Sequence, residues 1–475
     1  MTNPIETSLP IPQTPAAGES GWRRPAAIFA GIEYLLVFLL FLSCSTSFRI
    51  TIQSGIINPP QIFALVYILW RGIAGGRTNG KAEYEARWLT RGLFIFAGLA
   101  GILFLLSANW EIRRLIIFDW LTAGLVLVCL LRSPITDWKR IALLFIAAAL
   151  PTAVTGIAQH ALGIGLAPKD FSGWARDASS YPIYGLFSHS NDLAVFLYWP
   201  FLVAAGLAVA YRSWKRAAFA GLAVLFGLAL YWTISRSTLI TLIVVIILFF
   251  LAVSLRQRKW FLRVIAALAA IGVLGLILIL ATQSVVTINN LLSGRLYLWN
   301  NTWQIITQDP LMLPLGFLSP LSDARNEFWI PHNIYLLFWI QFGWIGPLLL
   351  AGAGIHLLRS GWIRYERLRA HRPAAILWAG MAGLFLVNGM VSLYFHEPNF
   401  LINFLCATVI WMFQIVEIDS ADASARAAAL QAAPLPGPIP PASGGSPRPM
   451  WDASRAKLKP PVGRTTGSKT QKKKR

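Results

Sequence analysis

Long apolar runs separated by short polar segments dominate residues 26–417. A helix needs about 20 mostly apolar residues to cross about 30 Å of hydrocarbon. Twelve runs reach or approach this length, with approximate limits of 26–47, 55–71, 92–109, 114–131, 140–160, 191–211, 216–234, 238–255, 261–281, 333–358, 374–395 and 399–417. The pattern therefore predicts an all-α integral membrane protein with about twelve transmembrane helices.

The two ends of the chain differ in character from this apolar body. Residues 1–25 are polar and rich in proline, and residues 418–475 are rich in Ala, Pro, Ser and Gly before a basic end. Such segments bury too little apolar surface to fold. We expect two disordered cytoplasmic tails around one polytopic membrane domain, and we expect the basic end to lie near anionic lipids.

The composition is that of a membrane protein, and the distribution of basic residues along the chain explains the net charge. Hydrophobic residues make up 56% and charged residues 13% of the 475 positions, whereas a soluble domain has about 25% charged residues. With the N-terminus placed in the cytoplasm, 33 of the 41 Lys and Arg residues fall on the cytoplasmic side. Positive charge retained inside predicts that both termini are cytoplasmic. The charge of +21 is then a feature of topology, and we expect no nucleic acid partner.

Two predicted outer loops, 161–190 and 282–331, are longer than the others, and functional residues often lie on long loops held by a rigid scaffold. In the second loop, Arg295 begins a segment with apolar residues at helical spacing. These residues are Leu296, Trp299, Trp303 and Ile306. The spacing predicts a short helix lying at the membrane interface, ended by Pro310.

Two arginines on the predicted outer side are candidates for holding an anion. Arg236 lies in a three-residue turn, and Arg295 lies at the start of the interfacial helix. A guanidinium group can bind a phosphate with two parallel hydrogen bonds. Either arginine could instead extend toward lipid headgroups, so both interpretations stay open.

His332 and Asn333 precede the tenth apolar run. Imidazole titrates near neutral pH, which suits it to remove a proton from a hydroxyl group. A helix N-terminus favours anions and disfavours imidazolium, so His332 would stay neutral beside a bound anion. The alternatives are that His332 only hydrogen-bonds at the helix cap and that Asn333 is an ordinary cap.

Three further positions could shape the same site. Gly343 and Gly346 are three residues apart on one predicted helix face, which would permit close helix packing. Asn191, followed by Asp192, stands at the mouth of the sixth helix, where either residue could be a cap.

Two acids lie within or near apolar runs, namely Glu33 and Asp119. Such residues either pair inside the helix bundle or mark a transport pathway. No set of His, Asp or Glu residues has dependable metal-ligand spacing, and the sequence contains no P-loop-type motif. We therefore expect neither a metal nor another cofactor.

Several of these segments together resemble the O-antigen ligase family. The signature nearest the C-terminus in that family is His, a small polar residue, nine further residues and then Gly-x-x-Gly. His332-Asn333, the nine residues 334–342, and Gly343-Trp344-Ile345-Gly346 match it. Three earlier segments occur in the same order as in that family: 191–194, the turn around Arg236, and 294–299. The whole motif region covers about 185–350. The sequence departs from the family where His-Pro-Asn is common, because residues 189–191 read His-Ser-Asn.

The resemblance implies a GT-C-like membrane glycosyltransferase that is inverting and independent of metals. Its donor would be a glycan on undecaprenyl diphosphate, and its acceptor a hydroxyl of a glycan, lipid or protein. His332 would be the catalytic base, and Arg236 and Arg295 would bind the diphosphate. Asn191, Asn333, Gly343 and Gly346 would shape the site, which would face outward from a bacterial cytoplasmic membrane.

Other functions remain as alternatives at this stage. A polysaccharide polymerase of the same superfamily would share these residues and would differ only in its acceptor. A lipid or polysaccharide transporter would use Glu33 and Asp119 to carry protons. A scaffold for polysaccharide assembly would not need the outer arginines.

Overall fold

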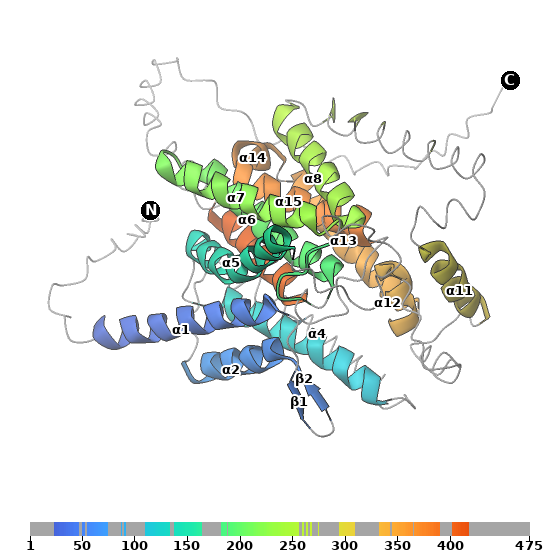
Figure 1. The fold of residues 1–475 in the computed structure, drawn as a ribbon, viewed down its shortest axis with the longest axis horizontal. Helices are drawn as coiled ribbons and strands as arrows, with labels where there is room; N and C mark the ends of the chain where they lie inside the picture. Colours follow the sequence, from blue (N-terminus) through green and yellow to red (C-terminus); the bar gives the residue numbers. More distant parts are fainter. Residues whose placement is uncertain are drawn as a thin grey trace, which may run out of the picture. The chain divides into compact units, whose positions relative to one another are not determined.

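The computed structural model of the chain is predominantly helical (Figure 1). It describes residues 23–46, 50–52, 55–74, 110–133, 137–163, 182–187, 189–255, 294–308, 332–342, 344–363, 365–389 and 401–417, with isolated positions within 87–91 and 259–274. All of these belong to a unit spanning Met1–Ser420. The predicted tail 418–475 and nearly all of the tail 1–25 lie outside the described residues.

The elements follow in chain order as α1 (Arg23–Cys44), β1 (Ile50–Ile52), β2 (Gly55–Ile57), α2 (Pro59–Ala74), α4 (Trp110–Leu131), α5 (Trp138–Leu162), α6 (Ser190–Ala210), α7 (Trp214–Trp232), α8 (Arg236–Ser254), α11 (Arg295–Gln308), α12 (Ile334–Phe342), α13 (Ile345–Ile363), α14 (Tyr365–Ala370), α15 (Arg372–Gly383) and the π-helix η5 (Leu384–Asn388). A further apolar helix covers Leu401–Glu417. The short strands β1 and β2 pair antiparallel.

Four helices among the described residues are long and apolar enough to cross a membrane, namely α5, α6, α7 and α8. Shorter apolar helices cover Ile28–Cys44, Phe118–Leu131 and Leu401–Glu417. The run 92–109 and most of the run 261–281 lie outside the described residues. The structure is thus that of a helical membrane protein, while the count of twelve spans stays a prediction.

Two predicted spans differ from the structure. The run 333–358 is not one helix, because α12 ends at Phe342 and α13 begins at Ile345 after a turn at Trp344. The run 374–395 begins as α15 and then widens into the π-turn of η5. Hydrophobicity could not reveal either feature, because residues on both sides of each irregularity are equally apolar.

Helix α6 is the centre of the packed core. Fourteen of its 21 residues are buried, among them Trp199 and Tyr198. It packs against α5, α7, α8 and α15, which explains why it is apolar on every face. The Tyr198 hydroxyl donates a hydrogen bond of 2.7 Å to the Gly380 carbonyl of α15. A tyrosine buried in this way needs such a partner.

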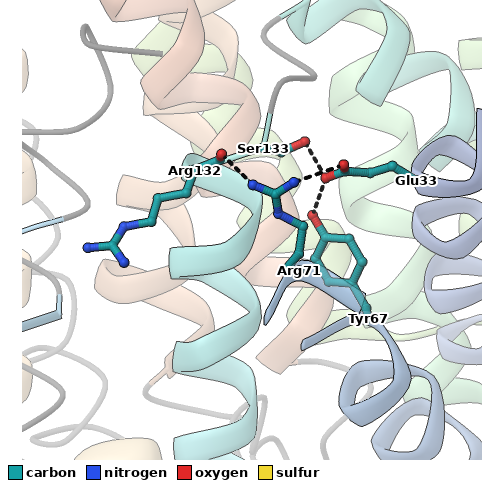
Figure 2. Close-up of polar contacts among 5 residues, drawn as sticks. All are labelled: Glu33, Tyr67, Arg71, Arg132 and Ser133. Atoms are coloured by element: carbon teal, nitrogen blue, oxygen red, sulfur yellow. Dashed lines mark hydrogen bonds and ion pairs between the residues drawn. The ribbon is translucent and has the colours of Figure 1, made fainter. Parts of the chain in front are cut away.

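A buried polar network joins α1, α2 and the end of α4 (Figure 2). The Arg71 guanidinium pairs with the Glu33 carboxylate at 3.1 Å, and their side chains are 6% and 3% exposed. Tyr67 and Ser133 donate to the other Glu33 oxygen at 3.2 and 2.6 Å. Arg71 also donates to the Arg132 carbonyl at 2.7 Å. Each charge is therefore held by several partners inside the protein.

The sequence left open whether Glu33 and Asp119 pair inside the bundle or mark a transport pathway, and their contacts bear on this choice. Both oxygens of Glu33 have partners within the bundle, and Asp119 accepts a hydrogen bond from Gln61 of α2. A proton carrier must exchange its proton along a path, whereas Glu33 is fixed by an ion pair. The geometry therefore favours a structural role for Glu33 over a role in transport.

We expect removal of either partner of the buried pair to destabilise the fold strongly. Glu33→Gln or Arg71→Met leaves one charge uncompensated at a buried position, which costs about 3–5 kcal/mol. The thermal unfolding midpoint in detergent micelles should fall clearly for each single variant. The double variant Glu33→Leu with Arg71→Met should recover part of the loss, because no unpaired charge remains.

The matched control is the exposed pair Arg140–Asp137, whose side chains are 64% and 48% exposed. Solvent screens this pair, so Arg140→Gln should leave the midpoint nearly unchanged. Equal midpoints for Glu33→Gln, Arg71→Met and Arg140→Gln would contradict the structural role of the network.

Candidate functional site

Three helices place their ends together around η5. Tyr198 of α6 lies against Gly380, and Gly206 lies against Pro373, so α6 and α15 run antiparallel. The N-terminus of α6 consequently lies at the end of α15 that continues into η5. Helix α8 also packs against both α15 and η5. We call this region, formed by η5 and the N-terminal turns of α6, α8 and α12, the site end.

The segment before α6 is tied to the end of α7. The Ile183 amide donates to the Trp232 carbonyl at 3.2 Å, and the Trp232 ring stacks on His160 with centroids 4.3 Å apart. Gln159 of α5 bonds both the amide and the carbonyl of Gly185 at 3.0 Å. These contacts hold the segment 183–185, which leads to Asn191, close to the end of α7 and therefore to the turn that carries Arg236.

The turn between α7 and α8 presents Arg236 as the first residue of α8. Ile234 has φ 55°, a left-handed conformation that is strained for a β-branched residue. The Ser235 hydroxyl contacts the hydroxyls of Ser237 and Thr238 at 3.4 and 3.2 Å, and all three residues are buried. Arg236 itself is exposed, and its side chain makes no hydrogen bond or ion pair within the described part of the chain.

His332 lies at the N-terminus of α12 with an unusual backbone. Its φ is 45°, in the left-handed region that costs a non-glycine residue about 1–3 kcal/mol. The next residue, Asn333, is buried, and its Oδ1 accepts from the amides of Tyr335 and Leu336 at 2.9 and 3.0 Å. Asn333 is therefore the N-cap of α12. Such strain at a helix mouth is typical of functional positions.

Arg295 and His332 come together from two different helices. Helix α11 begins at Arg295 and packs against α12, where the rings of Trp303 and Trp339 are 6.0 Å apart. The pKa of His332 lies below its usual value of 6.5, first because of partial burial and then because of the positive charge of Arg295. Both causes disfavour the charged form of the imidazole, although the residue as a whole is exposed.

Gly346 has a structural role. A Cβ at this position would lie 2.1 Å from the Phe338 carbonyl oxygen, so the turn between α12 and α13 requires glycine. Gly343 lies outside the described residues. The expectation that the two glycines share one helix face therefore stays a prediction, while the structure places Gly346 in α13 and ends α12 at Phe342.

Asn191 also differs in detail from expectation. The N-cap of α6 is His189, whose side chain makes no capping hydrogen bond, and Asn191 lies exposed in the first turn. The described residues provide no contact between Asn191 or Arg236 and His332. The packing of α11 on α12 thus places Arg295 near enough to His332 to lower its pKa, and Arg236 and Asn191 lie at the same end of the bundle.

Sequence reasoning missed the contact that holds α12 in place. The Tyr335 hydroxyl donates to the carbonyl of Phe385, which lies in η5. A tyrosine three residues after the histidine could have signalled a polar contact, but its partner is a backbone group 50 residues away. A π-turn has no dependable sequence signature, although π-turns are frequent at functional sites.

The charges at the site end favour the binding of an anion near the imidazole of His332. The N-termini of α6 and α8 carry partial positive charge, and neither has a side chain that caps its first amide groups. Arg236 and Arg295 add full positive charges at the starts of α8 and α11. Within the described ranges, no group of three or more His, Cys, Asp or Glu residues could hold a metal ion.

Comparison with known proteins identifies part of the chain. Residues 221–351 match the family model described as O-antigen ligase. The match includes Arg236, Arg295 and His332, whereas Asn191 lies before it. No curated protein matches the sequence.

The influence of Arg295 on His332 can be measured directly. In Arg295→Gln the repulsion between the guanidinium and an imidazolium is lost, so the pKa of His332 should rise. The measurement is a pH titration of carbon-13-labelled histidine by NMR, with the His332 signal assigned from its loss in His332→Gln. Its midpoint should move to higher pH.

Arg212→Gln is the matched control, since Arg212 is exposed beyond the opposite end of α6. It removes the same charge and should leave the midpoint unchanged. If Arg295→Gln also left it unchanged, the two side chains would not interact.

Proposed function

Since residues 221–351 carry the O-antigen ligase domain, we propose that this chain is a membrane glycosyltransferase. It transfers a glycan from undecaprenyl diphosphate to an acceptor hydroxyl at the outer face of the bacterial cytoplasmic membrane. The observation that carries the proposal is the packing of α11, which begins at Arg295, against α12, which begins two residues after His332.

In the proposed reaction His332 removes the proton from the acceptor hydroxyl. The acceptor oxygen attacks the anomeric carbon of the donor glycan, and the bond from that carbon to the diphosphate oxygen breaks. Attack on the face opposite the leaving group inverts the anomeric configuration. The bonding electrons leave with the diphosphate, and the proton remains on His332 until it passes to solvent.

The leaving diphosphate gains negative charge as the bond breaks, so cations fixed in advance lower the barrier. Arg295 and Arg236 are the residues that we assign to this role. The N-termini of α6 and α8 act in the same direction, because their first amide groups have no side-chain cap and can attract an anion. A cation beside His332 has a second effect, since it disfavours the imidazolium form and keeps the base unprotonated.

Removal of the catalytic base should lower the rate of glycan transfer, whereas removal of an arginine remote from the site end should not. In proteoliposomes containing a lipid-diphosphate-linked glycan and an acceptor, we expect His332→Ala to lower transfer by about 10²–10⁴-fold. Arg236→Gln and Arg295→Gln should also lower it, because the leaving diphosphate loses a stabilising charge. The measurement is the release of undecaprenyl diphosphate together with formation of the glycosylated acceptor.

The control for this experiment is Arg212→Gln, which removes an exposed arginine remote from the site end. It should transfer glycan at the wild-type rate. Wild-type activity in His332→Ala would refute the assignment of the base. Comparison of lipid A core, a growing glycan chain and a peptide as acceptors would distinguish ligase from polymerase and from protein glycosylation.

The proposed orientation predicts which residues water-soluble reagents reach from outside. A cysteine at Tyr297, which is 54% exposed on α11, should react with a membrane-impermeant maleimide in intact spheroplasts. A cysteine at Lys215, near the start of α7, should react only after the membrane is permeabilised. The reverse pattern would place the site on the cytoplasmic side. Unsubstituted protein gives the background from Cys44, Cys129 and Cys406.

A further inference from the structure

The helix α12 is short, and close contacts hold it at both ends. At its C-terminal end, Gly346 approaches the Phe338 carbonyl so closely that no side chain would fit. At its N-terminal end, a Cβ on Gly389 would lie 2.7 Å from Ile334 Cγ2, so the helix start rests directly on the backbone after η5. The Tyr335 hydroxyl adds a hydrogen bond to the Phe385 carbonyl in η5. Tyr335 thus provides the directional polar contact at this end.

The position of Tyr335 is transmitted to His332 through the helix cap. The amide of Tyr335 donates to Asn333 Oδ1 at 2.9 Å, and Asn333 directly follows His332. The left-handed φ of His332 places its side chain away from the direction that a helical residue would take. Such a conformation persists only where its surroundings fix it. A shift of the first turn of α12 would therefore move the imidazole relative to Arg295.

We propose that Tyr335 is a positioning residue, whose hydrogen bond to the π-helix carbonyl of Phe385 holds His332 in place against its substrate and Arg295. This inference rests on the proposed function, in which His332 is the base. Tyr335 acts through the cap and the backbone, and touches no reacting atom in the proposal. The π-turn of η5 supplies the acceptor, and the near-isosteric phenylalanine side chain cannot make this bond.

A purely structural role for Tyr335 would predict a different result. In that case loss of the hydroxyl would lower the stability of the protein but leave the rate of each folded molecule unchanged. A positioning role predicts a slower chemical step in a folded protein, because a displaced base loses its alignment with the acceptor hydroxyl. The ionisable side chains on α11, α12 and η5 are Arg295, Tyr297 and Tyr335.

The test compares Tyr335→Phe with Tyr211→Phe, which removes the same hydroxyl beyond the opposite end of α6. In the proteoliposome assay, we expect Tyr335→Phe to lower kcat on the order of tenfold, equivalent to about 1.4 kcal/mol in the barrier. The KM for the donor should stay unchanged, since Arg236 and Arg295 are intact. Tyr211→Phe should behave as wild type in both parameters.

The NMR titration of His332 provides a readout that does not depend on activity. In Tyr335→Phe its midpoint should move toward the usual histidine value, because the imidazole is less confined beside Arg295. Gly389→Ala displaces Ile334 by a different route and should cause a shift in the same direction. Thermal unfolding of each variant shows what fraction is folded, and kcat is expressed per folded protein.

The outcomes separate the two proposals. A wild-type kcat and an unchanged His332 titration in folded Tyr335→Phe would overturn the positioning role, whatever reaction the protein catalyses. A wild-type protein that transfers no glycan would overturn the proposed function. The titration would then still decide whether Tyr335 positions His332.

Discussion

Polar groups inside this bundle of apolar helices must find their partners within the protein, because hydrocarbon offers none. The Glu33 carboxylate meets this requirement with Arg71, Tyr67 and Ser133. The same requirement pairs the Tyr335 hydroxyl with a carbonyl of η5. Each pairing also fixes the relative position of the helices that supply the groups. Polar contacts thereby give the bundle a geometry that non-directional apolar packing alone would leave adjustable.

The two regions that these contacts organise differ in character. Around Glu33, opposite charges are matched and buried, which suits a fixed brace between α1, α2 and α4. At the site end, cations lie beside helix N-termini, and His332 and Ile234 adopt strained left-handed conformations. Backbone strain and positive charge gathered near helix N-termini oppose stability and favour the binding of an anion. This contrast separates a stable framework from an end that is suited to bind an anion.

Much of the fold was predictable because apolar length is a direct physical requirement of crossing a membrane. The start of α11 at Arg295 and the Asn333 cap also follow from local residue chemistry. The break between α12 and α13 did not, since Phe342 and Ile345 are as apolar as the middle of any span. The sequence indicated that Gly346 allows close packing. It did not indicate that the backbone packed against Gly346 is that of Phe338.

The sequence by itself determined the membrane class and most of the helical elements, and it supplied the candidates for a base and for cations, because each follows from composition or local spacing. Only the tertiary structure decided which of them meet. It placed Arg295 beside His332, paired Glu33 with Arg71, and joined Tyr335 to η5 across 50 positions of sequence. Such contacts depend on how helices distant in the chain pack together. A periodic apolar pattern shows that a helix is buried, but it does not show against what.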